Sequence, residues 1–254
     1  MTPADIIPVD SQEDETDRVG PENGEHLATS QELLDALPDT TVVDPPLIFL
    51  TAIATVVALI GLFLNNVAII VGAMVVSPLL SPITGFTLEL AVGRPHRAFA
   101  HLRAFVILLF LVVVLSAAIT TVLFTFGPIV FTPQILSRFE RRDVYLVMAV
   151  LLGFAAMIAQ VKGFHETLVG IGISIALLPP MAVAGIALAL FRTNSLSALA
   201  LAFDNIIGVT IGGFLGVFYF KLGQAGRARR PLVRTFGILL VLLALLYLNL
   251  LLTS

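Results

Sequence analysis

The chain alternates long apolar runs with short polar connections. Between Asp44 and Glu89 lie 44 residues without a single Asp, Glu, Lys or Arg, and another 34 lie between Arg103 and Arg138. Because about 20 residues at a rise of 1.5 Å cross the hydrocarbon of a bilayer, runs of this length predict transmembrane helices. None shows the wide polar face of a soluble amphipathic helix. Seven spans are predicted, at residues 47–64, 67–91, 104–126, 144–161, 167–191, 198–220 and 235–253.

Charge divides the chain into two parts suited to different solvents. Of the 254 residues 58% are hydrophobic and only 12% are charged, about half the usual share of a soluble domain. Residues 1–46 carry 12 of the 17 acidic residues and one basic residue, Arg18. We therefore predict an acidic, mostly disordered cytoplasmic tail at 1–46, with a short amphipathic helix at 30–37. The membrane block that follows is predicted as repeat one at 47–126, repeat two at 144–220 and a peripheral helix at 235–253.

The distribution of basic residues predicts the orientation in the membrane. With seven crossings, 10 of the 14 Lys and Arg residues lie on the N-terminal side. Since cytoplasmic loops retain Lys and Arg, we expect a multi-pass protein of the inner (plasma) membrane with its N-terminus in the cytoplasm and its C-terminus outside. If spans two and five were re-entrant loops, the count would be 9 against 5, so it favours full crossings only slightly. The basic loop 221–234 suits anionic lipid headgroups, whereas nucleic-acid binding is not expected.

Spans two and five share a pattern of glycine and proline. At an offset of 100 residues the glycines coincide, and the prolines between them are one residue out of phase. The matching residues are Gly72, Pro78, Pro82 and Gly85 in span two, and Gly172, Pro179, Pro180 and Gly185 in span five. Because each copy holds three spans, the second copy must enter from the opposite face of the membrane. The predicted fold is all-α, a 3+3 inverted-topology repeat with one additional C-terminal helix.

The prolines also predict a functional site. Proline lacks an N–H group and frees a carbonyl within a helix, which is costly in hydrocarbon unless something satisfies it. Paired interrupted spans are the best sequence indication of a transport site. We therefore predict that spans two and five both unwind near the midplane, with kinks that only shape packing as the alternative. The predicted ligand- or ion-binding residues here are Ser77, Pro78, Ser81, Pro82, Pro179 and Pro180.

Polar residues inside the spans complete the candidate site. Asp204 and Asn205 lie about six residues inside predicted span six, where a carboxylate costs about 2.5–3.5 kcal/mol and normally faces the protein interior. If the span began later, Asp204 would lie at the interface instead, and both interpretations stay open. In a second tier, Glu89 is expected to be a solvated or snorkelling interfacial acid near Arg94, and the amides are expected to be turn and interface residues, or alternatively to line a vestibule. This tier comprises Asn65, Asn66, Glu89 and Gln160.

Other patterns exclude or favour further functions. The repeat of Gly208, Gly212 and Gly216 predicts close helix packing, or alternatively an interface between protomers. Cysteine is absent, and the sequence has no phosphate loop, no His-Glu-x-x-His pair and no serine elbow. We expect no enzymatic activity, no cofactor and no metal site.

Two motifs resemble a known family. Residues 65–83 read NNVAIIVGAMVVSPLLSPI and residues 172–181 read GISIALLPPM. They are similar to the first two motifs of an uncharacterised hydrophobic domain of bacterial and archaeal membrane proteins, domain-of-unknown-function family 389, and the region around Asn205 resembles its third. The likeness covers roughly residues 55–220. It implies a polytopic prokaryotic membrane protein and supplies no substrate.

These patterns favour a secondary transporter or ion-conducting protein for a small ion or solute. Its site would lie between the two broken spans, and the sign of the ligand's charge stays open. The alternative is a non-transporting scaffold or sensor that acts through the acidic tail or the basic loop, and a third interpretation is a lipid-handling protein. The expected partners are the lipid bilayer, the ion or solute, and further copies of the same chain.

Overall fold

The computed structural model describes residues 42–140, 143–162, 166–190 and 195–220, together with Gly237 and Val241. All regular elements within these residues are helices. The tail up to residue 41, the basic loop 221–234 and nearly all of predicted span seven lie outside the described residues. The predictions made for those segments therefore stay predictions.

Each of the first six predicted spans corresponds to helix. The first half of the chain forms α2 (Pro45–Phe63), α3 (Val67–Val76), α4 (Leu80–Val92) and α5 (Pro95–Phe126). The second half forms the short α6 (Pro133–Leu136), which the pattern did not predict, and α7 (Asp143–Lys162), α8 (Glu166–Ala189) and α9 (Ser195–Tyr219). By length and composition α2, α5 and Ser197–Tyr219 can each cross a membrane, and α3 with α4, bent by 51° at their break, has the length and composition of a broken span or a re-entrant loop.

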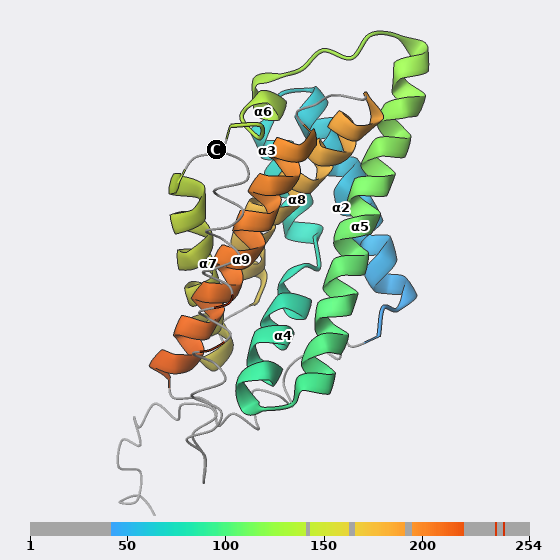
Figure 1. Cartoon of the computed structure of the whole chain (residues 1–254). Coiled ribbons are helices and arrows are strands. Elements are labelled where there is room, and N and C mark those ends of the chain that lie inside the picture. The colour runs from blue at the N-terminus through green and yellow to red at the C-terminus, as the bar shows by residue number, and fades with distance from the viewer. Residues whose placement is uncertain are drawn as a thin grey trace, which may run out of the picture.

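The helices run alternately up and down one elongated bundle. In Figure 1, α2, α5 and α8 ascend, whereas α3 with α4, α7 and α9 descend. A hydrogen bond of 2.7 Å from Thr132 Oγ1 to the carbonyl of Leu62 joins the start of α6 to the end of α2 at the upper end. Predicted spans two and five thus each run along the length of the bundle (Figure 1).

The ends of the helices follow from local sequence. Asp44 caps α2 by accepting a hydrogen bond from the N–H of Leu47, and prolines occupy the first two helical positions, where no N–H is needed. At the far end of span two, Gly93 adopts φ 90°, a left-handed conformation that glycine allows without strain. These caps explain the start of α2 and the end of α4.

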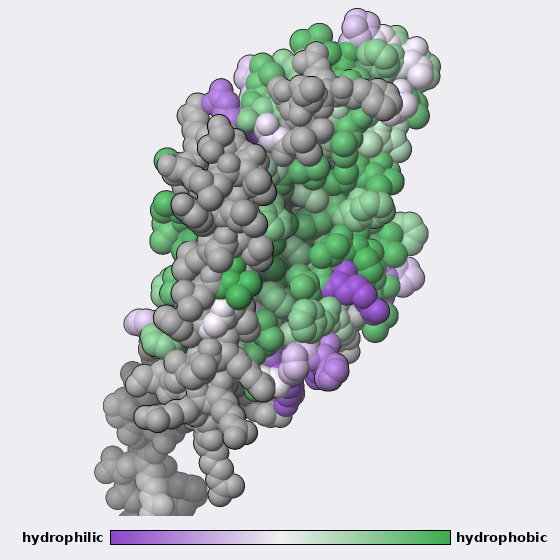
Figure 2. Space-filling model, in the orientation of Figure 1, coloured by the Kyte–Doolittle hydropathy of each residue, from purple (hydrophilic) through white to green (hydrophobic). Residues whose placement is uncertain are grey.

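The outer surface of the bundle is apolar. Large hydrophobic side chains are exposed along α2 and α5, among them Phe49, Ile53, Val106, Phe110 and Val114. Figure 2 shows a hydrophobic face over most of the bundle's height, with hydrophilic residues gathered mainly toward its two ends. In water such a surface would be unfavourable, whereas lipid accommodates it. The described part of the chain is therefore a helical membrane protein.

The glycines of α9 allow α7 and α9 to approach closely, as the repeat predicts. A Cβ atom at Gly212 would overlap the carbonyl oxygen of Val150, and one at Gly216 would lie 2.5 Å from Cβ of Met157. The contact is reciprocal, because a Cβ at Gly153 of α7 would overlap the carbonyl oxygen of Val209. Small residues at this spacing let two backbones meet. In this structure they meet within one chain.

Candidate functional site

Span two is broken where the sequence predicts. Ser77 ends α3 with extended backbone (φ −70°, ψ 122°), and α4 begins at Leu80. Ser77, Pro78 and Leu79 make no backbone–backbone hydrogen bond with any residue that the structure describes. Pro82 lies in the first turn of α4, where its missing N–H would have had no partner in the helix. Pro78 therefore breaks the span, and Pro82 is compatible with the helix that follows.

Span five is not broken, which corrects the prediction. Helix α8 continues from Glu166 to Ala189 with both Pro179 and Pro180 inside it. Pro180 cannot donate to the carbonyl of Ala176, four residues earlier. That carbonyl instead accepts a hydrogen bond of 2.7 Å from Nδ2 of Asn205 on α9. We attribute the continuity of α8 to this bond and to packing against α5, α9, α7 and α3, which together replace part of what the prolines remove.

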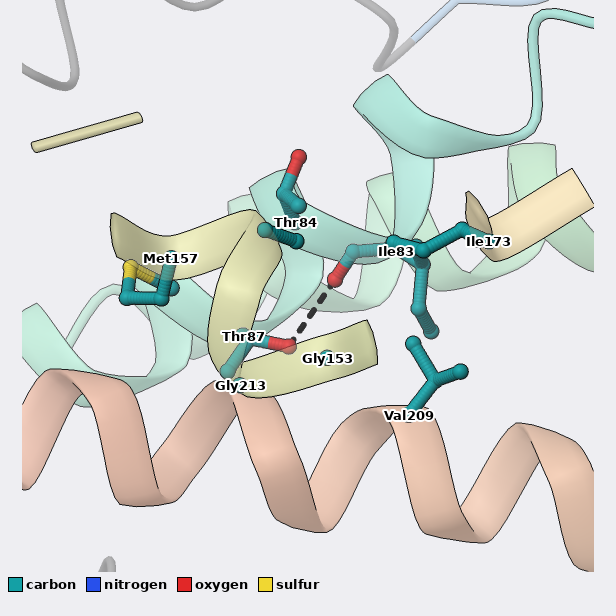
Figure 3. A pocket seen from close by; sticks show the side chains of 9 residues that line it. Ile83, Thr84, Thr87, Gly153, Met157, Ile173, Val209 and Gly213 are labelled. Atoms are coloured by element: carbon teal, nitrogen blue, oxygen red, sulfur yellow. Dashed lines mark hydrogen bonds between the residues drawn. The ribbon is translucent and has the colours of Figure 1, made fainter. Parts of the chain in front are cut away.

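A small cavity lies beside both α4 and α8. Its lining shows which residues of these helices lie at the same height along the bundle. Its volume is about 10 Å³, room for about one water molecule. In Figure 3, Thr87 Oγ1 points to the carbonyl of Ile83, to which it donates a hydrogen bond of 2.9 Å. The cavity lies between α4, α7, α8 and α9 and is lined by Ile83, Thr84, Thr87, Gly153, Ala156, Met157, Ile173, Val209 and Gly213.

One helical turn from the cavity, three helices converge. Ala176 follows Ile173 by one turn on α8, and Asn205 precedes Val209 by one turn on α9. On α4, Leu80 precedes Thr84 by one turn, and Thr84 Oγ1 donates to its carbonyl at 3.0 Å. The broken end of α4, the proline-freed carbonyl and Asn205 therefore occupy one layer of the bundle. We call it the break layer, defined by Ser77–Ser81, Ala176 and Asn205.

Several buried oxygen atoms in or next to the break layer have no hydrogen-bond partner among the described residues. They are Ser77 Oγ, Ser174 Oγ and Asn205 Oδ1. Ser81 and Pro78 are half-buried and Pro82 is buried. The layer thus combines part of the predicted site, namely Ser77, Pro78, Ser81 and Asn205, with oxygen atoms that have no hydrogen-bond partner among the described residues. Buried groups of this kind call for a bound water, ion or ligand.

Asp204 lies in the interior rather than at an interface. Helix α9 begins at Ser195, and Asp204 is nine residues further along and 5% exposed. Of the two interpretations left open by the sequence, the structure favours the buried one. Asp204 already takes part in a polar or electrostatic interaction.

Glu89 is buried and paired, which corrects the expectation of a solvated acid. Its side chain is 1% exposed, and Oε1 accepts from Nε of Arg97 at 3.1 Å, while Nη1 of Arg94 lies 4.0 Å from Oε2. Arg97 belongs to the first turn of α5, so the pair joins the end of α4 to the start of α5. Burial of the carboxylate is compensated by two half-exposed arginines.

Of the remaining second-tier residues, the two asparagines stabilise turns and helix ends, and Gln160 has no assigned role. Asn65 has φ 53°, and its Oδ1 accepts from the N–H of Gln134 at 3.3 Å, whereas Asn66 caps α3 through the N–H groups of Ala68 and Ile69. Both lie at the upper end of the bundle, as the turn interpretation predicts. Gln160 is half-buried near the end of α7.

Sequence reasoning missed Thr84, Thr87 and the bond from Asn205 to Ala176. The threonines are ordinary helix residues in sequence, and nothing marks them as cavity-lining. The bond had a readable signal, because a proline inside a buried helix requires a donor for the carbonyl four residues earlier, and Asn205 is one of the few amides inside the spans. No sequence rule pairs the two helices in that register.

The fold and the break layer define a polytopic helical membrane protein. A family model described as Domain of unknown function (DUF389) matches residues 74–211, more than half of the chain, and the chain belongs to that family. The match includes Ser77, both proline pairs and Asn205. The resemblance of the sequence motifs is thereby confirmed.

The chain also resembles an uncharacterized protein of Methanocaldococcus jannaschii. The two are 28% identical over 187 residues, which cover 73% of this chain and 57% of the relative. The matched region thus spans little more than half of that relative's length. No solved structure matches the chain.

Proposed function

We propose that the protein is a secondary transporter or ion-conducting protein for a small ion or solute, with its site in the break layer. The break between α3 and α4 carries the proposal. There, Ser77, Pro78 and Leu79 make no backbone–backbone hydrogen bond with the described part of the chain, inside an apolar bundle. Unsatisfied backbone groups cost several kcal/mol in hydrocarbon, and irregular backbone is tolerated at depth where it lines a cavity or binds a ligand.

The arrangement of the two halves supports an inverted repeat. In this proposal the first half, α2 to α5, and the second half, α7 to α9, each contribute three crossings; α2 ascends whereas α7 descends (Figure 1). The middle segments, α3 with α4 and α8, contact one another at the centre. In this proposal the two halves move relative to each other about the break layer. The predicted seventh span stays peripheral, and the N-terminus faces the cytoplasm.

Each predicted site residue then has a distinct role. Ser77 Oγ and the free backbone groups of the break contact the ligand. Asp204 carries a coupling proton or cation, because a carboxyl group buried within a membrane span normally has a role of this kind. Asn205 and Pro180 hold the wall of the site through the bond to Ala176.

Flux into proteoliposomes tests the proposal. We expect the full chain to raise the flux of at least one of ²²Na⁺, ⁸⁶Rb⁺, ³⁶Cl⁻ and protons, followed with an internal pH dye, above that of protein-free vesicles. Ser77→Ala and Asp204→Asn should each lower this flux at least tenfold. Ser116→Ala is the matched control, because Ser116 is also buried with an unpartnered Oγ but lies on α5. Flux that is absent for every probe, or unchanged in both site variants, contradicts the proposal.

A further inference from the structure

We propose that the break layer binds a small monovalent cation of the size of Na⁺. This inference rests on the proposed function, because it names the ligand class of the same site. It also settles the sign of the ligand's charge, which the sequence left open.

The first observation is a pair of buried oxygen atoms without donors. Ser77 is 7% exposed and Asn205 is 2% exposed, and neither Ser77 Oγ nor Asn205 Oδ1 has a hydrogen-bond partner among the described residues. The orientation of the Asn205 amide is fixed chemically. The carbonyl of Ala176 can only accept, so the amide atom that faces it must be the nitrogen. Asn205 Oδ1 is therefore an acceptor.

Further oxygen atoms nearby also have only acceptor capacity left. Thr84 Oγ1 donates its proton to the carbonyl of Leu80, and Thr87 Oγ1 donates to that of Ile83, so both hydroxyls can still accept but not donate. Pro78 cannot donate to the carbonyl of Met74, in the last turn of α3. Neutral hydroxyl, amide and carbonyl oxygens are the ligands that hard cations prefer.

The described arginines lie outside the break layer, which disfavours an anion. Asp204, next to Asn205 on α9, is 5% exposed and already takes part in a polar or electrostatic interaction. Among the described arginines, Arg94 and Arg97 pair with Glu89 at the far end of α4, Arg103 is exposed, and Arg138 follows α6. None of the four is among the residues that define the break layer. The N-terminus of α4 is a weak anion site as well, because Pro82 removes one of its N–H groups.

The size of the cavity limits the ligand. The space one turn from the layer amounts to about 10 Å³, which admits one water molecule or one dehydrated small ion. An organic solute would require the helices to separate. A single inorganic cation is small enough for this cavity.

Binding to the purified full-length protein in lipid nanodiscs tests the inference without any need for transport. Thermal unfolding and ²²Na⁺ binding are measured in NaCl against N-methylglucamine chloride at equal ionic strength, with LiCl and KCl as further probes. We expect saturable stabilisation by at least one of the small cations, together with displaceable ²²Na⁺ binding. Ser77→Ala should raise the half-saturating concentration at least tenfold.

The matched control is again Ser116→Ala. Ser116 packs against Gly185, nine residues beyond Ala176 and thus about 13 Å along α8, so its removal should leave cation binding unchanged. Equal behaviour in every chloride salt, or stabilisation that follows the anion when Na⁺ is held constant, would overturn the inference. So would an equal loss of binding in the two serine variants. Cation binding without flux would refute transport alone, whereas flux without cation binding would refute this inference alone.

Discussion

The bond between Asn205 and the carbonyl of Ala176 is expected to stabilise the protein only because Pro180 is present. In a regular helix the N–H of residue 180 would occupy that carbonyl, and an amide from α9 would be redundant. The perturbation is therefore a double-mutant cycle that combines Asn205→Leu with Pro180→Ala. Leucine has the same number of side-chain heavy atoms as asparagine and the same branching, so the first change removes the donor without opening a cavity.

The expected magnitude follows from the burial of the bond. An acceptor left unsatisfied in the interior costs about 1–3 kcal/mol, whereas hydrogen bonds between membrane helices average about 0.6 and reach about 1.7 kcal/mol. The Ala176 carbonyl has lost its local donor, and Asn205 is almost fully buried, so the upper part of the membrane range applies. Asn205→Leu should lower the free energy of unfolding by about 1–2 kcal/mol in the native background. The loss should be about 0.5 kcal/mol or less when Pro180→Ala is present.

Reversible unfolding in mixed micelles, followed by circular dichroism, measures the cycle. The titrations are done in N-methylglucamine buffer, so that cation binding does not contribute. Thr210→Val is the matched control on α9, because the Thr210 hydroxyl donates to the carbonyl of Ile206 in its own helix and satisfies no proline-freed group. If Asn205→Leu costs the same with and without Pro180, the explanation for the continuity of α8 is wrong.

Three further predictions concern packing, charge and the tail. Gly212→Leu should prevent the close approach of α7 and α9, so that size-exclusion chromatography no longer shows a monodisperse folded protein. Gly72→Ala is the control and should leave the elution profile unchanged, because a Cβ atom there meets nothing within 4 Å. Arg97→Gln should lower the melting temperature more than Glu89→Gln does, because only the former leaves a buried carboxylate short of its donor; the reverse order would contradict the burial of this pair. Deletion of residues 1–40 should leave flux unchanged if the protein is a transporter. If neither the full chain nor the deletion variant shows flux, and the deletion releases a bound partner protein, the scaffold interpretation is favoured.

The membrane segments were largely predictable from sequence. Hydrocarbon thickness requires long uncharged runs, and proline and glycine mark the ends of helices, so the first six predicted spans correspond to helices within a few residues, except that α5 begins nine residues before its predicted start. The break at Pro78 was predictable for the same local reason, since proline has no N–H for the carbonyl four residues earlier. The extension of α5 into the charged segment 95–103 was not predicted, because hydrophobicity indicates the membrane-embedded part of a helix and not its solvated end.

The tertiary structure decided which polar groups meet. The same residue type, proline, breaks span two and is accommodated in α8, and the difference is an amide that belongs to another helix. Glu89 and Arg97 are only eight residues apart in sequence, yet it is the packing of α4 on α5 that buries the Glu89 carboxylate and pairs it with Arg97. Sequence by itself determined where helices form, because backbone hydrogen bonds in lipid must be satisfied locally. The pairing of side chains across helices depends on register and rotation, which arise only when the helices pack.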